Sequence, residues 1–347
     1  MYRDWAAAAE RAILTRHLRR VWGLPGTVLG RSGWPPTPDQ RLHWHWNYWW
    51  QAHLLDCLID AQARAPEPAR AATIRRFVHS IWLRNFGRWS NEYYDDMAWL
   101  GLAVQRIPSS APLAVILSEL RSAWTPDCGG GIWWRKGDDF KNAPSNGPAA
   151  ILHARAGEVA RARELLGWME TTLVDPDTGL VWDGLHTGRH ELVKVVYTYC
   201  QGVFLGACLE LSEMDSAART VRAVAAHCAP GGVLRGQGGG DGGLFAGILA
   251  RYLALSATRL PRGTEADAAR ALVLTSAEAC FSGASDAPGG PLFSPDWTLP
   301  AWEYNPQTPA GGKPPEPLPT DSIGCPARDL SVQVGAWLLL EAAATLE

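Results

Sequence analysis

Apolar residues recur every three or four positions through most of this 347-residue chain, a spacing typical of amphipathic helices. Strand-like alternation of apolar and polar residues is scarce. The spacing predicts twelve helices, at about residues 3–21, 45–64, 68–86, 91–106, 111–123, 145–155, 157–173, 190–211, 214–228, 242–256, 264–281 and 329–346. Turn-forming sequences such as "PDCGGG", "DPDTG" and "LPRG" separate many of them.

Helix hairpins of this size can stack into a bundle, an open solenoid or a closed ring of pairs. No sequence repeat of about 34 or 40 residues is visible, which counts against tetratricopeptide and HEAT arrays. Twelve helices supply the six hairpins of a closed ring, so we expect an all-α (α/α)6 barrel of about twelve helices. The apolar segment 329–346 should close the ring against the first helix. No linker divides the chain, and we expect a single domain over residues 1–347.

Charge and composition exclude several classes of protein. The net charge of −3, without a long basic run, argues against a nucleic-acid partner bound through its phosphates. No stretch of 18 apolar residues occurs, so we expect no membrane span. The first 20 residues carry charges throughout, unlike a signal peptide, which predicts a cytoplasmic protein, or a secreted one if a signal was trimmed. Seven cysteines without a C-x-x-C pair predict reduced thiols, and we expect a monomer with no metal and no cofactor.

Asp95 and Asp96 stand side by side in "YYDDMAW" (residues 93–99), within a predicted helix. With Ser90 or Asn91 as N-cap, the pair would lie in the first turns, where the helix dipole favours an anion. Repulsion would then raise the pKa of one carboxyl group and leave the other ionised. A retaining glycosidase needs this combination of anion and acid, roughly 5 Å apart. The alternative is a solvated helix face, which is seldom flanked by so many aromatic residues.

Two long segments are expected to be non-helical, at 124–144 and 282–328. In the first, the glycines of "GGG" allow close backbone approach to a ligand, and Trp133 and Trp134 could stack on a sugar. A loop held by buried tryptophans is the equal alternative. The second segment carries Trp297, Trp302 and Tyr304, which favour a packed loop.

Other patterns predict structure more than chemistry. The sequence "DPDTG" (175–179) predicts a tight turn rather than a calcium loop, and "RGQGGGDGG" (235–243) lacks the features of a phosphate loop. His43, His45 and His53 lie among aromatic residues and are expected to be hydrogen-bonded or packed rather than bound to metal. Among those neighbours, Trp44 and Trp46 are candidates for the rim of a cleft.

The motif "YYDDMAW" resembles the hallmark of family 76 glycoside hydrolases, the bacterial endo-α-1,6-mannanases. Similar motifs follow the family's order: "YWWQAHLLDCLIDA" (48–61), "GGGIWWRKGDDFKNAPSNGPAA" (129–150), "TGLVWDGL" (178–185), "YTYCQGVFLGACLEL" (197–211), "LFAGILARYL" (244–253) and "DLSVQVGAWLLL" (329–340). The resemblance spans almost the whole chain, and the fold that it implies is also an (α/α)6 barrel.

The resemblance implies roles for seven residues. Asp95 would be the nucleophile and Asp96 the general acid/base of a retaining enzyme that cleaves α-1,6-mannosidic linkages in α-mannan or related α-mannosides such as α-manno-oligosaccharides. The residues implied to line the substrate subsites are Tyr94, Trp133, Trp134, Asn142 and Asp183. The sequence departs from the family pattern at Cys200, where asparagine is usual, and at Pro144, where an aliphatic residue is usual.

Three alternative functions remain open. A transglycosylase would use the same two aspartates and replace water by an acceptor sugar. A non-catalytic carbohydrate-binding protein would keep the aromatic cleft and lose turnover. A sugar epimerase or isomerase on this barrel would commonly use a histidine base, and no suitable inward histidine is evident from the sequence.

Overall fold

The computed structural model describes residues 1–108, 111–301 and 326–347, and helices dominate them. The helices are α1 (Tyr2–Arg16), α2 (Pro38–Arg41), α3 (Tyr48–Arg64), α4 (Pro68–Arg84), α5 (Tyr94–Val104), α6 (Ala111–Ser122), α7 (Ala143–Arg155), α8 (Val159–Thr172), α9 (Thr198–Glu210), α10 (Met214–His227), α11 (Gly242–Arg259), α12 (Thr264–Ser282) and α13 (Leu330–Ala344).

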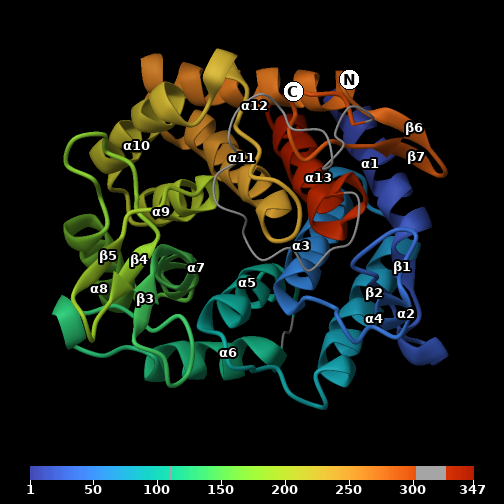
Figure 1. Ribbon diagram of the computed structural model, residues 1–347, viewed down its shortest axis with the longest axis horizontal. Helices are drawn as coiled ribbons and strands as arrows, with labels where there is room; N and C mark the ends of the chain where they lie inside the picture. Colours follow the sequence, from blue (N-terminus) through green and yellow to red (C-terminus); the bar gives the residue numbers. More distant parts are fainter. Residues whose placement is uncertain (109–110, 302–325) are drawn as a thin grey trace.

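Six of these helices form a closed inner ring, in the order α3, α5, α7, α9, α11 and α13, with α13 packed back against α3 (Figure 1). Each inner helix also packs against one outer helix: α4, α6, α8, α10, α12 and, for α13, the N-terminal α1. The last and first long helices therefore form the sixth hairpin. This arrangement is an (α/α)6 barrel, which confirms the predicted fold and the predicted contact between the chain ends.

The inner and outer helices of the barrel differ in how much of their surface is buried. Nearly every residue of α13 and α9 is buried, because an inner helix is covered on all sides. The outer α10 buries one face only, built on small and β-branched residues such as Ala217 and Val221. In the inner ring, α11 and α13 approach closely at glycines. A Cβ added to Gly247 would lie 2.3 Å from the carbonyl oxygen of Gly335.

Short antiparallel strands decorate the barrel. The strand β1 (Leu18–Arg19) pairs with β2 (Leu29–Gly30), and β6 (Ser285–Ala287) pairs with β7 (Gly290–Leu292). A three-stranded sheet joins β3 (Phe140–Asn142), β4 (Gly184–His186) and β5 (Glu191–Val193). The prediction of one helix over 190–211 is wrong at its start, because β5 occupies 191–193 and α9 begins at Thr198. The sequence "VKVVYTY" in this segment is rich in β-branched and aromatic residues, which favour extended chain.

Smaller predictions have mixed outcomes. The "DPDTG" segment is a turn, in which Asp175 accepts hydrogen bonds from the backbone of Asp177 and the hydroxyl group of Thr178. His43 and His53 are buried, whereas His45 is exposed and lies 3.9 Å from a carboxylate oxygen of Asp39.

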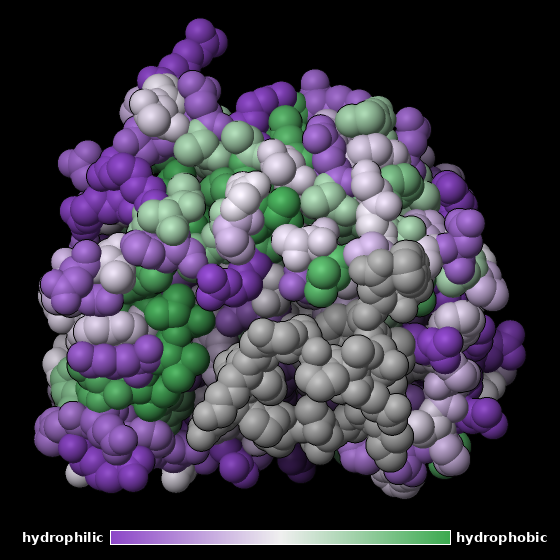
Figure 2. Space-filling view, turned by 45° about the horizontal axis from the view of Figure 1, so that its top comes forward, coloured by the Kyte–Doolittle hydropathy of each residue, from purple (hydrophilic) through white to green (hydrophobic). Residues whose placement is uncertain are grey.

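Some predicted features lie outside the described residues, namely Trp302, Tyr304 and Cys325. Within the described segments, the other six cysteines are free and Trp297 is buried. None of the helices described has both the length and the apolar character needed to cross a bilayer. Hydrophilic residues cover much of the periphery in the space-filling view, with smaller patches of hydrophobic residues between them (Figure 2).

The connectivity of the barrel determines where a site can form. One antiparallel outer helix connects each inner helix to the next, so the inner helices run in the same direction. Their N-terminal ends, at residues 48, 94, 143, 198, 242 and 330, consequently gather at one end of the barrel. Side chains far apart in sequence meet there.

Candidate active site

Two neighbouring carboxyl groups lie in the first turn of α5, at the N-terminal end of the barrel. The Oδ1 atom of Asp95 accepts a hydrogen bond from the backbone N–H of Asp96 at 2.8 Å, and its Oδ2 atom accepts one from the indole of Trp134 at 3.1 Å. Burial raises the pKa of Asp95 to about 7, although these donors act in the opposite direction. The nearby charge of Asp241 raises this pKa further.

Asp96 has a different environment. Its Oδ2 atom accepts a hydrogen bond from the side-chain amide of Asn91 at 2.5 Å. Burial raises the pKa of Asp96 well above its ordinary value, and the charge of Asp95 raises it more. The pair therefore holds its proton more firmly on Asp96 than on Asp95, which gives an acid and a potential anion side by side.

The prediction that Ser90 or Asn91 caps α5 is wrong, although Asn91 does contact the carboxyl pair. Tyr93 occupies the N-cap position and makes no side-chain cap hydrogen bond. Asn91 lies two residues earlier, where its Oδ1 atom accepts from the backbone of Tyr93 at 2.9 Å while its amide donates to Asp96. Asn91 therefore orients the Asp96 carboxyl group instead of capping the helix.

A third carboxylate of this site, Asp241, escaped the sequence reasoning. It is the N-cap residue of α11, and its Oδ1 atom accepts hydrogen bonds from the indoles of Trp49 at 3.0 Å and Trp50 at 2.8 Å. Its charge raises the pKa of Asp95 and of Asp96, which places it near the pair. The available signal was an acidic residue directly before a strongly apolar helix.

Aromatic rings form a wall beside the carboxyl groups. Tyr199 stacks on Phe245 with ring centres 3.9 Å apart and planes within 1°. The ring of Trp49 lies 6.5 Å from Tyr199 and 6.3 Å from Phe245. Burial raises the pKa of Tyr199 well above 10, and neighbouring acidic groups, Asp95 among them, raise it further. The phenol is therefore a neutral hydrogen-bond donor facing the acids.

Asp183 approaches the same wall from the turn before β4. Burial raises its pKa to about 7, and its charge contributes to the raised pKa of Tyr199. Its Oδ1 atom lies 4.0 Å from the thiol of Cys200, so one departure from the family pattern directly contacts a predicted subsite residue. The other departure, Pro144, lies in the first turn of α7, where the missing N–H is tolerated.

The loop before α7 contributes Trp134 directly and holds other residues in supporting positions. Lys141 is buried and donates to the carbonyl groups of Thr125, Asp127 and Gly130 at 3.0, 2.9 and 2.7 Å. Its ammonium group also lies 4.5 Å from the ring of Trp133. Trp134 thus reaches the acids, and Lys141 contacts its half-buried neighbour Trp133, while stacking of either ring on a sugar stays a prediction.

Two further predicted residues point elsewhere. Asn142 is buried and caps α7 by accepting a hydrogen bond from the backbone of Ser145 at 3.2 Å. Tyr94 is buried, and its ring lies 5.9 Å from the ammonium group of Lys136 rather than beside the acids. Binding roles for Tyr94, Trp133 and Asn142 stay predictions.

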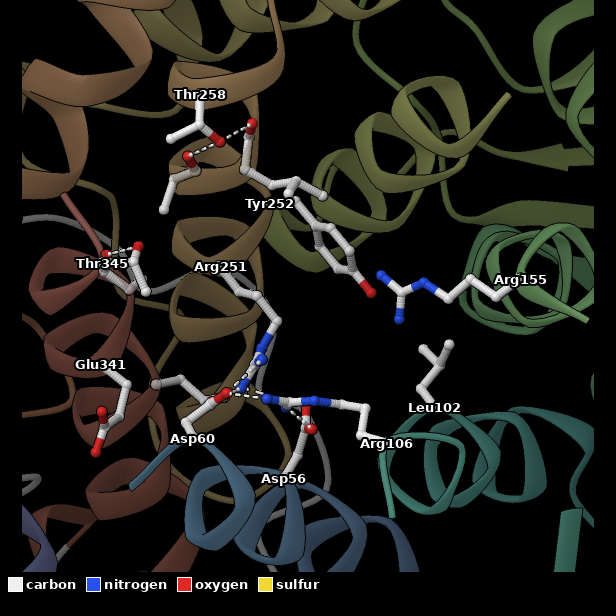
Figure 3. Close-up of a pocket in the computed structure, with 14 residues that line it drawn as sticks. Asp56, Asp60, Leu102, Arg106, Arg155, Arg251, Tyr252, Thr258, Glu341 and Thr345 are labelled. Carbon is white, nitrogen blue, oxygen red and sulfur yellow. Dashed lines mark hydrogen bonds and ion pairs between the residues drawn. The ribbon is translucent and has the colours of Figure 1, made fainter. Parts of the chain in front are cut away.

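The opposite end of the barrel has a cavity of about 300 Å³ with a different chemistry. Figure 3 shows Asp56 and Asp60 of α3 meeting Arg106 and Arg251 at its centre. Arg106 pairs with both aspartates, and Arg251 does the same, at 3.2 Å from Asp56. These ion pairs connect α3, α11 and the end of α5, so the network acts as a clamp between helices.

The other charges that line this cavity are also paired. Glu341 bonds to Arg64 at 3.0 Å, and Arg155 bonds to Glu210 at 2.7 Å. The acidic groups that line this cavity are therefore held in ion pairs with arginines.

Known proteins resemble the chain along its whole length. The structure matches the α-1,6-mannanase GH76A of Salegentibacter sp. HEL1_6 with a TM-score of 0.83 and 29% identity over 100% of both chains. An inactive variant of that enzyme, with two consecutive aspartates replaced by asparagine, was solved in complex with α-1,6-mannotriose. The Lin0763 protein of Listeria innocua shares the fold, with a TM-score of 0.81, 24% identity and coverage of 99% of this chain and 97% of that one.

The curated relatives match a smaller part of the chain. Mannan endo-1,6-α-mannosidase DCW1 of Candida albicans is 25% identical over 223 residues, which are 54% of this chain and 47% of that protein. The chain thus spans about half the length of the curated relatives it matches. The family model described as glycosyl hydrolase family 76 matches residues 6–310, most of the barrel and all of the carboxylate site. This chain belongs to glycosyl hydrolase family 76.

Proposed function

We propose that this protein hydrolyses α-1,6-mannosidic linkages with retention of configuration, with Asp95 as nucleophile and Asp96 as general acid/base. The observation that carries the proposal is the unequal pair in the first turn of α5. Asp95 accepts two N–H donors that stabilise its anion, whereas Asp96 lies in the field of Asp95 and keeps its proton. A family member with two consecutive aspartates replaced is inactive, which supports the same assignment here.

The proposed reaction has two steps. In the first, a carboxylate oxygen of Asp95 forms a bond to the anomeric carbon while the glycosidic C–O bond breaks. Asp96 gives its proton to the departing oxygen. In the second, Asp96 takes a proton from water, whose oxygen attacks the anomeric carbon and displaces Asp95. Two inversions give net retention, and both carboxyl groups return to their starting states.

The surroundings of the pair suit a neutral sugar. The stacked rings of Tyr199 and Phe245 offer an apolar face, while Asp183 and Asp241 can accept hydrogen bonds from sugar hydroxyl groups. Relatives that bind or cleave α-1,6-linked mannose indicate the substrate class. Linear α-1,6-mannan is therefore the substrate proposed, and cleavage within the chain is the mode that these relatives suggest.

Product analysis on linear α-1,6-mannan tests the proposal. Wild type should release short manno-oligosaccharides, and Asp95→Asn and Asp96→Asn should each lose at least about a thousandfold in kcat/KM. Asp177→Asn is the matched control, because Asp177 is exposed in the turn 175–179. Binding without release by wild type would instead identify a carbohydrate-binding protein. Chain transfer to an added acceptor as the dominant reaction would identify a transglycosylase.

A further inference from the structure

A second group of aromatic rings lies beside the carboxylate site, around the C-terminal end of α4. The guanidinium carbon of the buried Arg84 lies 5.7, 5.9, 5.2 and 5.6 Å from the ring centres of Trp22, Trp44, Trp46 and Phe86. Trp22, Trp44 and Phe86 nevertheless remain 39%, 58% and 73% exposed. We call these three exposed rings, with Arg84 beneath them, the aromatic platform.

The backbone around the platform adopts conformations that side chains normally avoid. Trp22, His43 and Phe86 have φ angles of 50°, 53° and 55°, in the left-handed region. Hydrogen bonds from the indole of Trp22 to the carbonyl of Leu42, at 2.8 Å, and from Arg84 to that of His43, at 2.6 Å, hold this geometry. At Phe86 the left-handed conformation ends α4, because the N–H groups of Phe86 and Gly87 donate to the carbonyl groups of Leu83 and Trp82 at 3.1 and 2.9 Å. These turns leave the rings of Trp22, Trp44 and Phe86 accessible to a ligand.

The platform is continuous with the catalytic pair through packed side chains. Trp46, on the same arginine, packs edge-on against Tyr48 with ring centres 5.5 Å apart. The hydroxyl group of Tyr48 donates to the carbonyl of Trp89 at 2.6 Å. Burial raises the pKa of Tyr48, and the charge of Asp96 raises it further, so Tyr48 lies between Trp46 and the pair.

The chain itself provides a second connection. The loop after α4 leads from Phe86 to Asn91, whose amide holds Asp96. The side chain of Asn85 braces this loop by donating to the carbonyl groups of Arg88 at 2.8 Å and Ser90 at 3.0 Å. Asn91 is five positions after Phe86, so their Cα atoms are at most about 18 Å apart. One oligosaccharide chain can therefore contact both places.

We propose that the aromatic platform is a distal binding site for the same α-1,6-mannan chain that the pair cleaves, an inference that rests on the proposed function. The C–H faces of pyranose rings pack well on exposed aromatic rings. An anionic ligand fits poorly, because Arg84 already donates to the carbonyl groups of His43 and Trp44, at 2.6 and 3.1 Å. The platform should thus strengthen binding of long chains and leave short ones unaffected.

The test compares a long linear α-1,6-mannan with α-1,6-mannotriose as substrates for wild type, Trp44→Ala, Phe86→Ala and the double variant. Each substitution should raise KM for the polymer about fivefold, with kcat unchanged and kcat/KM for the trisaccharide unchanged. Val159→Ala is the control, because it trims an exposed apolar side chain, 45% accessible, at the start of α8. Thermal unfolding of each variant establishes that it is folded.

The outcomes are distinguishable. Wild type that cleaves both substrates, with an unchanged polymer KM in the folded double variant, would overturn the distal site and leave the proposed function intact. Wild type that cleaves neither substrate would overturn the proposed function first. Sedimentation measures the oligomeric state of wild type and of the double variant. If wild type is a dimer and the double variant a monomer, the platform is a subunit interface and the inference is overturned.

Discussion

At the scale of single residues, different hydrogen-bond donors and charges give different pKa values to two carboxyl groups that are neighbours in sequence. Asp95 accepts from a backbone N–H and from Trp134, which favours its anion. Asp96 accepts from Asn91 and lies next to the charge of Asp95. The two aspartates are easy to recognise in the sequence because they are adjacent. For the same reason their negative charges repel, and this repulsion keeps a proton on Asp96.

Asp96→Asn should make the protein more stable at neutral and higher pH while abolishing activity. A carboxyl group whose folded-state pKa is raised binds more protons in the folded than in the unfolded protein, so stability falls as pH rises from about 4 through the folded pKa. Removing this group should increase the free energy of unfolding by about 1–3 kcal/mol at pH 8.

Urea unfolding between pH 3.5 and pH 8 measures this effect. The difference between Asp96→Asn and wild type should shrink below about 0.5 kcal/mol at pH 3.5, where Asp96 is mostly protonated in both the folded and the unfolded protein. Asp177→Asn should change stability by less than about 0.5 kcal/mol throughout, because Asp177 is exposed. A variant less stable than wild type at pH 8 would show that the carboxylate is stabilised, rather than strained, by its surroundings.

At the scale of elements, helical periodicity predicted most helices because the apolar residues of each one must face the barrel. It failed at residues 191–193, where a short edge strand leaves too few residues for a period to be read. It also could not show how closely two inner helices approach. That information lies in glycines whose partners are distant in sequence, such as Gly247 and Gly335.

Gly247→Ala should destabilise the barrel by about 1–3 kcal/mol, because the new methyl group would lie 2.3 Å from the carbonyl oxygen of Gly335. Gly167→Ala is the matched control in an outer helix. An added Cβ at Gly167 meets nothing within 4 Å, so alanine should stabilise α8 by about 0.5–1 kcal/mol. Chemical denaturation of both variants measures these changes, and equal effects of the same sign would refute the close contact.

At the scale of the whole molecule, the barrel separates its charges between two ends. The N-terminal end of the inner ring collects acids with raised pKa values, and the opposite end holds paired arginines and acids (Figure 3). Burial alone would raise the pKa of Asp56, but Arg251 and Arg106 together lower it to about 2. The stabilisation from this carboxylate is therefore present above about pH 4 and is lost as pH falls through about 2.

Arg251→Met should lower the free energy of unfolding at pH 7 by about 2–4 kcal/mol, because it leaves Asp56 and Asp60 with Arg106 as their common partner. Its kcat on mannan at 25 °C should remain close to wild type, since the clamp lies at the far end of the barrel. Arg163→Met removes an exposed ion pair with Glu213 and should cost less than about 1 kcal/mol. If Arg251→Met were as stable as Arg163→Met, the network of ion pairs would have no role in stability.

Sequence reasoning could find Asp95 and Asp96, the pair proposed to be catalytic, because they are consecutive. Asp241 could not be found in the same way, because its partners Trp49 and Trp50 lie some 190 positions earlier and meet it only when the ring closes. The same holds for Tyr199, which lies near Asp95 and Asp183 although the three residues come from distant parts of the sequence. Helical periodicity predicts the class of fold, but it does not predict which side chains meet when the barrel closes. That closure assembles the rest of the site.

The central claim, that Asp95 is the nucleophile and Asp96 the acid/base, is tested most directly by azide rescue of alanine variants on an aryl α-1,6-mannobioside with a good leaving group. Asp96→Ala should form the glycosyl-enzyme and transfer it to azide, which gives a glycosyl azide of α configuration. Asp95→Ala should give the β azide by direct displacement. The opposite stereochemistry in the two variants would exchange the roles, and no rescue of either folded variant would contradict the account.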